Sequence, residues 1–262
     1  APRVRKGGVI GLGMTLVCAL PVLLGFVVPF ALFGYCAVSV GDPMLGRAFS
    51  GYVFNTVGVA SVAAVLTVVC AVWLALALRM AAFGGRRARG LDAAVRLATL
   101  GYAMPGMVLA IGLLGPLTWL DRGLAGGIKA AFGSSPGLLL TGSVFALVLV
   151  YLARFMTVAF NGCDSGMVRI HPHYDAAARS LGAGPGQLLK RVHLPLLAPS
   201  VLSAWLLVFV DIVKELPATL ILRPFNFETL ATRAYRLASD ERIAEASTAS
   251  KAIVLLGLIP AL

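Results

Sequence analysis

The sequence predicts an all-α integral membrane protein, a polytopic bundle of about six spans, and three observations support this prediction. Of its 262 residues 59% are hydrophobic and 13% are charged, whereas soluble domains average about 45–50% apolar and about 25% charged residues. The apolar residues form continuous runs and do not alternate, which predicts helices and not a β-barrel. Basic residues gather between these runs, as they do in the cytoplasmic loops of membrane proteins.

Windows with few or no charges that are long enough to cross a bilayer, about 20 residues, define the expected spans. In chain order they are 9–33, 53–76, 97–120, 130–153 and 192–222, with a sixth that begins near 252. Pro21 and Pro29 are expected to kink the first span. We expect residues 1–262 to form a single transmembrane domain whose last span is incomplete at 262, and both chain ends look like the edges of a fragment.

The distribution of Lys and Arg predicts the orientation in the membrane. If each span crosses once, the N-terminus and the loops 79–96 and 154–191 lie on one side, and they carry more than half of the 22 basic residues. This side is therefore predicted to be cytoplasmic. The net charge of +11 is attributed to this orientation and to contact with anionic membrane lipid. No recognition motif indicates nucleic acid as a partner.

The segment 223–251 is predicted to face outward. Leu230, Ala234, Leu237 and Ile243 indicate a short amphipathic helix within it. Two interpretations stay open. The segment is either a solvated connector or a surface that meets a soluble partner and shapes the outer mouth.

A cytoplasmic stretch, residues 174–195, interrupts the apolar pattern with "YDAAARSLGAGPGQLLKRVHLP". Good helix formers precede Gly182 and Gly184, which can end a helix in a left-handed cap, and Pro185 suits the first turn of a new helix. Pro195 is expected to end or kink that short helix before the fifth span. The pattern predicts a compact helix–turn–helix projection, either a connector or a docking element. No GK[ST] sequence follows the glycines and no strand precedes them, which excludes a phosphate-binding loop.

This stretch resembles the EAA loop of permease subunits of bacterial ABC importers, whose pattern is EAA, three residues, Gly, nine residues, Ile or Val, one residue, Leu-Pro. The elements Ala177, Ala178, Gly182, Val192 and Leu194-Pro195 match at every spacing. The glutamate position instead holds Ala176, with Asp175 just before it. In the family that acid is thought to seat the loop on the ATPase, and Asp175 or the apolar and Arg179 contacts would serve here.

The resemblance implies a non-catalytic transport subunit of the bacterial inner membrane with a type I importer fold. A coupling helix, roughly 182–189, would sit in a cleft of a cytoplasmic ATPase dimer, which would bind ATP and Mg; this chain would hold no cofactor or metal. A second permease half, identical or fused, and a periplasmic substrate-binding protein would complete the transporter. The implied coupling residues are Asp175, Ala176, Ala177, Ala178, Arg179, Gly182, Ala183, Leu189, Val192, Leu194 and Pro195.

The strip 213–247 is similar to the matching region of iron(III) importer permeases, in which "KELPATLLLRPF" leads to "TLATR" and "ASDER". Here the corresponding runs are 214–225, 229–233 and 239–242. Iron(III) is therefore the expected cargo. Permeases for thiamine and for aminoethylphosphonate share this architecture and remain alternatives. Iron permeases of this kind are often two fused halves, so the chain could be a second half.

Three charged residues, Asp211, Lys214 and Glu215, are expected within the fifth span. A charge at mid-membrane costs about 2.5–3.5 kcal/mol on insertion scales. Two interpretations stay open: a self-neutralised cluster that fixes this helix to its neighbours, or a pathway gate facing a central cavity.

Other functions receive little support from the sequence. His171, His173, Asp164 and Cys163 lie close together but are expected to be solvated loop residues and not a metal site. Arg154 is interpreted as a snorkelling residue at the end of the fourth span. A secondary transporter driven by an ion gradient would predict inverted repeats, and the two halves show none. A membrane-embedded enzyme would need a convergent acid–base set, and none is present.

Overall fold

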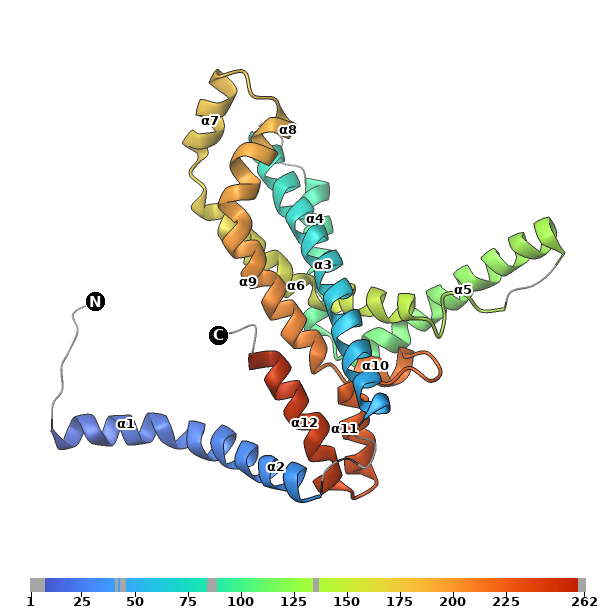
Figure 1. The fold of residues 1–262 in the computed structure, drawn as a ribbon. Coiled ribbons are helices and arrows are strands. Elements are labelled where there is room, and N and C mark those ends of the chain that lie inside the picture. Colours follow the sequence, from blue (N-terminus) through green and yellow to red (C-terminus); the bar gives the residue numbers. More distant parts are fainter. Residues whose placement is uncertain (1–7, 41, 43–45, 84–88, 134–136, 259–262) are drawn as a thin grey trace.

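The computed structural model describes residues 8–258 except 41, 43–45, 84–88 and 134–136, and its described elements are all helical (Figure 1). In chain order they are α1 (Val9–Val22), the π-helical turn η1 (Leu23–Val27), α2 (Val28–Ser39), α3 (Arg47–Phe83), α4 (Arg89–Ala98), the 3₁₀ turn η2 (Gly101–Ala103), α5 (Gly106–Phe132), α6 (Val144–Arg169), α7 (Pro172–Ser180), α8 (Pro185–Leu188), the π-helical turn η3 (Leu189–His193), α9 (Leu194–Val213), α10 (Pro217–Leu222), α11 (Leu230–Ser239) and α12 (Ile243–Leu258).

Membrane-length apolar helices confirm the predicted fold class. Five segments of the described chain are long and apolar enough to cross a bilayer: Gly11–Ser39, Ala48–Ala81, Gly106–Ala131, Val144–Arg169 and Gly186–Val213. α12, with 16 described residues, occupies the position of the predicted sixth span. It begins at Ile243 and not near 252 as predicted, because the helix continues through charged residues that the window criterion excludes.

Helices α3, α6 and α9 form the central bundle (Figure 1). α6 and α9 approach closely because small residues meet where they cross. A Cβ on Gly162 would lie 2.8 Å from the Cβ of Ala204, and one on Gly166 would lie 2.5 Å from the side chain of Ser200. Close backbone approach of this kind is how membrane helices gain packing energy, since lipid provides no hydrophobic drive for helix association.

The first predicted span is continuous, and its outer surface is apolar. α1, η1 and α2 follow one another without a break and extend away from the bundle, with α2 packed against α12 (Figure 1). No residue of its hydropathy window is buried within the chain. The π-helical turn η1 ends two residues before Pro29, whose ring and missing N–H cannot fit regular i→i−4 bonding.

The third predicted window, 97–120, is broken in the structure. It contains the end of α4, the turn η2 and the first half of α5, which starts after Pro105. The break lies against α6: Thr157 Oγ1 donates to the carbonyl of Thr99 at 2.6 Å, and a Cβ on Gly101 would lie 2.0 Å from the carbonyl oxygen of Ala153. Glycine is therefore required at 101. Non-helical backbone is tolerated in a membrane only where protein or a cavity surrounds it.

The predicted fourth span, 130–153, is wrong. Residues 130–132 end α5, and the helix that crosses is α6, which runs from Val144 to Arg169. The charge-free window stopped at Arg154, but this side chain lies in the middle of α6 and makes an ion pair inside the protein. Its interpretation as a snorkelling residue at a helix end is wrong for the same reason.

The fifth span also differs at both ends. The short helix does not end at Pro195: α8, η3 and α9 form one membrane-length segment, and the π-helical turn η3 ends two residues before the proline. At the other end α9 stops at Val213, and α10 is a separate short helix. The predicted outer helix exists as α11, in which Leu230 and Leu237 are buried, whereas Ile243 begins α12 and is exposed.

The contact between α6 and α9 gives the first testable prediction. Gly166→Ala should lower the midpoint of thermal unfolding of the detergent-solubilised protein, because the new methyl group would overpack against Ser200 and Leu197 at a cost of about 1–3 kcal/mol. Gly112→Ala in α5 is the matched control, since nothing lies within 4 Å of a Cβ there. Equal midpoints for both variants would contradict this packing.

Candidate functional site

The stretch 174–195 forms a projection at one end of the bundle, opposite α10 and α11 (Figure 1). α7 ends at Ser180, and Gly182 follows with a φ of 80°. Ala183 N–H donates to the carbonyl of Ala178 at 3.0 Å, and Gly182 N–H donates to that of Arg179 at 2.9 Å. This pair of bonds is the Schellman motif. The predicted left-handed cap is thus present at Gly182, and Pro185 opens α8 as predicted.

The base of the projection is fixed by a buried carboxylate. Asp175 is fully buried; its Oδ2 accepts a bond from Arg79 Nε at 2.9 Å, and its Oδ1 lies 2.8 Å from His193 Nε2. Arg79 belongs to α3 and His193 to η3, just before α9. One carboxylate therefore joins α7 to two helices of the central bundle.

Arg79 also joins the projection to α6. Its Nη1 donates to the carbonyl of Met167 at 2.7 Å and its Nη2 to that of Ile170 at 2.8 Å. These carbonyls lie at the C-terminal end of α6, where the helix leaves acceptors without intrahelical partners and favours a cation. The guanidinium thus closes the end of α6 and pairs with Asp175, so α3, α6 and α9 all meet the projection at this point.

The electrostatics of Asp175 follow from these contacts. Burial alone would raise the pKa of its carboxyl, but the hydrogen bonds from Arg79 and His193 outweigh burial and hold that pKa below its usual value. The carboxylate is thus ionised at neutral pH. Its burial means that it positions the projection from within and presents no surface to a partner. The direct seating contact on an ATPase that the resemblance assigned to this acid does not fit that position.

The outer face of the projection is small and partly apolar. Ala176, Ala177 and Gly182 are exposed, and Leu181, which the sequence analysis did not single out, exposes 88% of its surface beside the tight turn. Tyr174 is 57% exposed on the same helix–turn element. The projection thus exposes a leucine and a tyrosine outside the membrane-length helices. The remaining predicted coupling residues are Ala178, Ala183, Leu189 and Val192, which are half-buried, and Arg179, Leu194 and Pro195, which are exposed.

The second group of predicted residues lies near the opposite end of α9. Lys214 Nζ lies 2.8 Å from Asp211 Oδ1, so these two charges neutralise each other. Glu215 does not join them. It follows the end of α9, and its Oε2 lies 3.3 Å from Nε of Arg154 on α6, with both side chains largely buried.

The Arg154–Glu215 pair organises the break between α9 and α10. Arg154 Nη1 donates to the carbonyl of Met104 at 2.9 Å, and Thr219 Oγ1 donates to the carbonyl of Glu215 at 2.6 Å. A Cβ on Gly106 would lie 2.6 Å from Glu215 Oε1. The pair therefore ties α6 to two breaks, before α5 and before α10. Arg154 lies ten residues into α6, about 15 Å along it at 1.5 Å per residue.

Sequence reasoning missed both arginines that complete these sites. Arg79 was counted only for orientation, and nothing in the sequence links it to Asp175. Arg154 did leave a signal, because an isolated charge between two apolar runs is expected to have a partner inside the protein. No group of three or more His, Cys, Asp or Glu suited to a metal occurs among the described residues.

These features define a polytopic helical membrane subunit with a rigid projection at one end. The chain belongs to the family described as binding-protein-dependent transport system inner membrane component, whose model matches residues 74–260. The match covers the end of α3 and all elements from α4 to α12, and therefore both the projection and the Arg154–Glu215 pair.

Individual relatives are more distant. The chain is 26% identical to the Fe(3+)-transport system permease protein FbpB 2 of Haemophilus influenzae over 209 residues, 79% of this chain and 37% of that protein. It is 27% identical to the putative 2-aminoethylphosphonate transport system permease protein PhnV of Salmonella typhimurium, over 75% of this chain and 66% of that one. The chain thus spans about a third to two thirds of the length of these relatives.

Solved structures support the fold. A chain of a bacterial alginate ABC transporter, in complex with an alginate-bound periplasmic protein, superposes with a TM-score of 0.72 at 14% identity, covering 96% of this chain and 92% of that one. A second structure of a bacterial ABC transporter for alginate import gives a TM-score of 0.69. At this identity the likeness concerns the fold alone, and it confirms the type I permease architecture.

The buried carboxylate gives a second prediction. Asp175→Asn should accelerate backbone hydrogen exchange across 172–193 by the equivalent of about 3 kcal/mol, because it leaves the Arg79 guanidinium buried without its charge partner. Exchange measured by mass spectrometry tests this. Asp164→Asn, near the end of α6, is the control and should leave exchange in that segment unchanged. Equal protection in the two variants would show that the pair does not hold the projection.

A pH dependence follows from the same carboxylate. A carboxyl whose folded pKa is lowered stabilises the folded state fully above its unfolded pKa, about 3.9. That contribution is lost as the pH falls through the folded value. The difference in protection between the native protein and Asp175→Asn should therefore be constant above about pH 5 and shrink below about pH 4. If the difference in protection between the two proteins instead grew as the pH fell, the pKa of Asp175 would be raised on folding. That result would contradict the lowered pKa assigned to this carboxyl.

Proposed function

We propose that this chain is the transmembrane permease of an ATP-driven ABC importer, which moves its cargo from a periplasmic binding protein to the cytoplasm. Membership of the binding-protein-dependent transport family supports this proposal. ATP and Mg would be used by a separate ATPase dimer, and a second permease half, identical or fused, would complete the translocation path. A secondary transporter driven by an ion gradient would need no docking surface for an ATPase.

The observation that carries the proposal is the rigid attachment of the projection. Packed elements transmit a displacement instead of absorbing it. Because Asp175, Arg79 and His193 join the projection to α3, α6 and α9, a push on its exposed face would move the three central helices together. Ala176, Ala177 and Leu181 form the face that we assign to the ATPase, and Gly182 sets the turn that presents it.

For the cargo, we propose iron(III). The strip 214–242 supports this through its similarity to iron(III) importer permeases, and a relative named as an Fe(3+)-transport permease is consistent with it. Aminoethylphosphonate is the main alternative, because PhnV matches equally well; thiamine is a further one. Within the membrane we assign gating to Glu215 with Arg154, since this pair joins the two helix breaks. Asp211 and Lys214 form a separate, self-neutralised pair.

Docking of the ATPase is tested by co-purification. Leu181→Glu should reduce the amount of ATPase recovered with the solubilised permease by about tenfold, because an exposed apolar anchor is replaced by a charge. Gly182→Trp should do the same, since its φ of 80° is unfavourable for any side chain. Ile243→Glu, at the opposite end of the bundle, is the control and should retain the ATPase at the native level.

The cargo is tested separately by uptake. Cells that lack the gene, complemented with the native chain and its partners, should take up radiolabelled iron(III) in preference to thiamine or 2-aminoethylphosphonate. If the cells took up only 2-aminoethylphosphonate, this compound would replace iron(III) as the proposed cargo. The proposed ATP-driven mechanism would not be affected. Uptake that persists when Leu181→Glu has removed the ATPase would refute the mechanism itself.

A further inference from the structure

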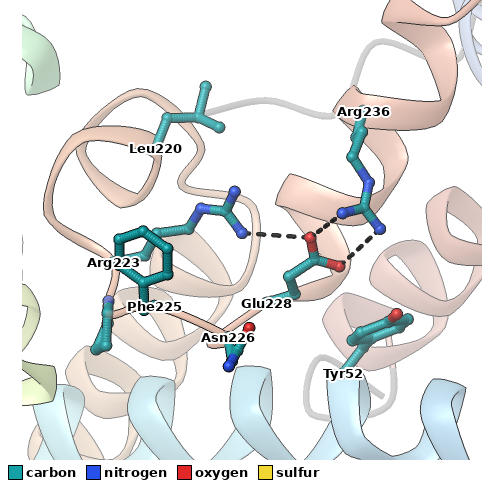
Figure 2. Close-up of a pocket in the computed structure, with 8 residues that line it drawn as sticks. Tyr52, Leu220, Arg223, Phe225, Asn226, Glu228 and Arg236 are labelled. Atoms are coloured by element: carbon teal, nitrogen blue, oxygen red, sulfur yellow. Dashed lines mark hydrogen bonds and ion pairs between the residues drawn. The ribbon is translucent and has the colours of Figure 1, made fainter.

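A concave pocket of about 530 Å³ lies at the end of the bundle opposite the projection. The start of α3, the end of α10, the loop before α11 and α11 itself form it (Figure 2). It is lined by Tyr52, Leu220, Arg223, Pro224, Phe225, Asn226, Glu228 and Arg236. Phe225 is fully exposed and forms one side of the opening. The volume is within the range of small-molecule sites, about 300–1,000 Å³.

Two guanidinium groups share one carboxylate in this pocket (Figure 2). Arg236 binds both oxygens of Glu228 with its two terminal nitrogens. Arg223 is held less firmly. Its Nη1 lies 3.3 Å from Glu228 Oε1 and 3.4 Å from the carbonyl of Phe227, and both distances are beyond the usual range for N–H···O bonds. Arg223 therefore has donor capacity for another acceptor.

The backbone around the pocket is held by hydrogen bonds that do not involve these charged side chains. Asn55 Nδ2 donates to the backbone carbonyl of Glu228 at 3.0 Å, and Leu230 N–H donates to Thr56 Oγ1 at 2.9 Å. A capping box between Thr229 and Thr232 fixes the start of α11. Because α3 and the capped helix hold the loop, replacing a charged side chain in the pocket should leave the backbone in place.

The local charge is positive. Beside the pocket, Arg233 pairs with both oxygens of Asp42 at 3.0 and 2.8 Å, and these two charges cancel. Glu228 balances one of the two pocket arginines, which leaves an excess of one positive charge. Arginine offers a planar fork of donors that matches the oxygens of phosphate and carboxylate groups. A bare metal cation would be repelled at this position.

We propose that this pocket binds a small oxyanion, a phosphate, phosphonate or carboxylate group, on Arg223, with Glu228 as the internal anion that competes for it. When the pocket is empty, Glu228 occupies the donors of both arginines. An incoming oxyanion takes over Arg223, where the internal contacts are long, while Arg236 keeps Glu228. The anion thereby exchanges with a carboxylate already present, which limits its affinity and allows release.

The consequence for transport rests on the proposed importer function. The pocket lies at the predicted outer end, where cargo would arrive. The cargo species that enters would then carry an oxyanion group, as either a metal ion with an oxyanion ligand or a phosphonate itself. Both sources present the same chemistry to Arg223, and binding to the pocket can be measured without transport.

The binding experiment uses the full chain in nanodiscs, with inorganic phosphate as the probe and ionic strength held constant with chloride. Phosphate binding, followed by ³¹P NMR line broadening, should be about tenfold weaker in Arg223→Gln, the loss expected for one charge-assisted hydrogen bond. Glu228→Gln should tighten binding, because it removes the competing carboxylate. Arg242→Gln is the matched control, since Arg242 pairs with Glu245 outside the pocket, and it should bind like the native chain.

Three results would overturn the proposal. The first is equal phosphate binding in the native chain, Arg223→Gln and Arg242→Gln, which would indicate only general attraction to a basic protein. The second is weaker binding in Glu228→Gln. The third is binding of a glutamate-rich peptide that depends on Arg223 while phosphate does not bind, which would identify a protein-docking surface instead.

A transport experiment distinguishes the two candidate cargoes, a metal ion with an oxyanion ligand and a phosphonate. Proteoliposomes with the complete transporter receive iron(III) as a citrate complex or, separately, 2-aminoethylphosphonate, each with its binding protein. We compare the uptake of each cargo by the Arg223→Gln and Arg242→Gln transporters. The cargo whose uptake falls only in Arg223→Gln is the one recognised at the pocket. If the native transporter moves neither cargo with ATP, both cargo assignments fail, and the phosphate measurement still decides whether the pocket binds anions.

Discussion

The structure depends on one buried carboxylate. Asp175 accepts bonds from Arg79 on α3 and His193 beside α9, while the same arginine closes the C-terminal end of α6. Removing a charged group from water is costly unless partners satisfy it, and a buried pair is valuable chiefly because losing either partner leaves the other charge unmatched. The constraint acts mechanically as well, since no helix among these three can move at this end without carrying the projection or breaking the group.

The fold class and the cap at Gly182 could be predicted from the sequence because they depend on local properties, namely apolar run length and glycine conformation. The boundaries of the fourth span could not. A charge-free window treats Arg154 as the end of a helix, whereas Glu215, 61 positions away, neutralises it inside the protein. Hydropathy reports the cost of exposing a charge to lipid and contains no information about a partner that removes that exposure.

The same limit applies to the candidate site. The spacing of Ala177, Gly182 and Pro195 identified the projection, but spacing does not distinguish a side chain that faces a partner from one that holds the element in place. Asp175, which the resemblance offered as a residue that seats the loop on the ATPase, is buried, and Leu181, which the motif does not include, is 88% exposed. Only the packing of α7 on the bundle determines which side of that helix faces solvent.

The π-helical turn η3 has a consequence for how α8 is oriented. Leu188 and His193 are five positions apart, and both are buried; in a regular α-helix such residues point in directions about 140° apart. The wide turn, with its i→i+5 bonding, brings them to the same side. It therefore sets the angular phase between α8 and α9. If the same residues wound as a regular α-helix, α8 would be rotated by about 100° about the helix axis, so that the turn at Gly182 would face a different direction while the membrane helix kept its place.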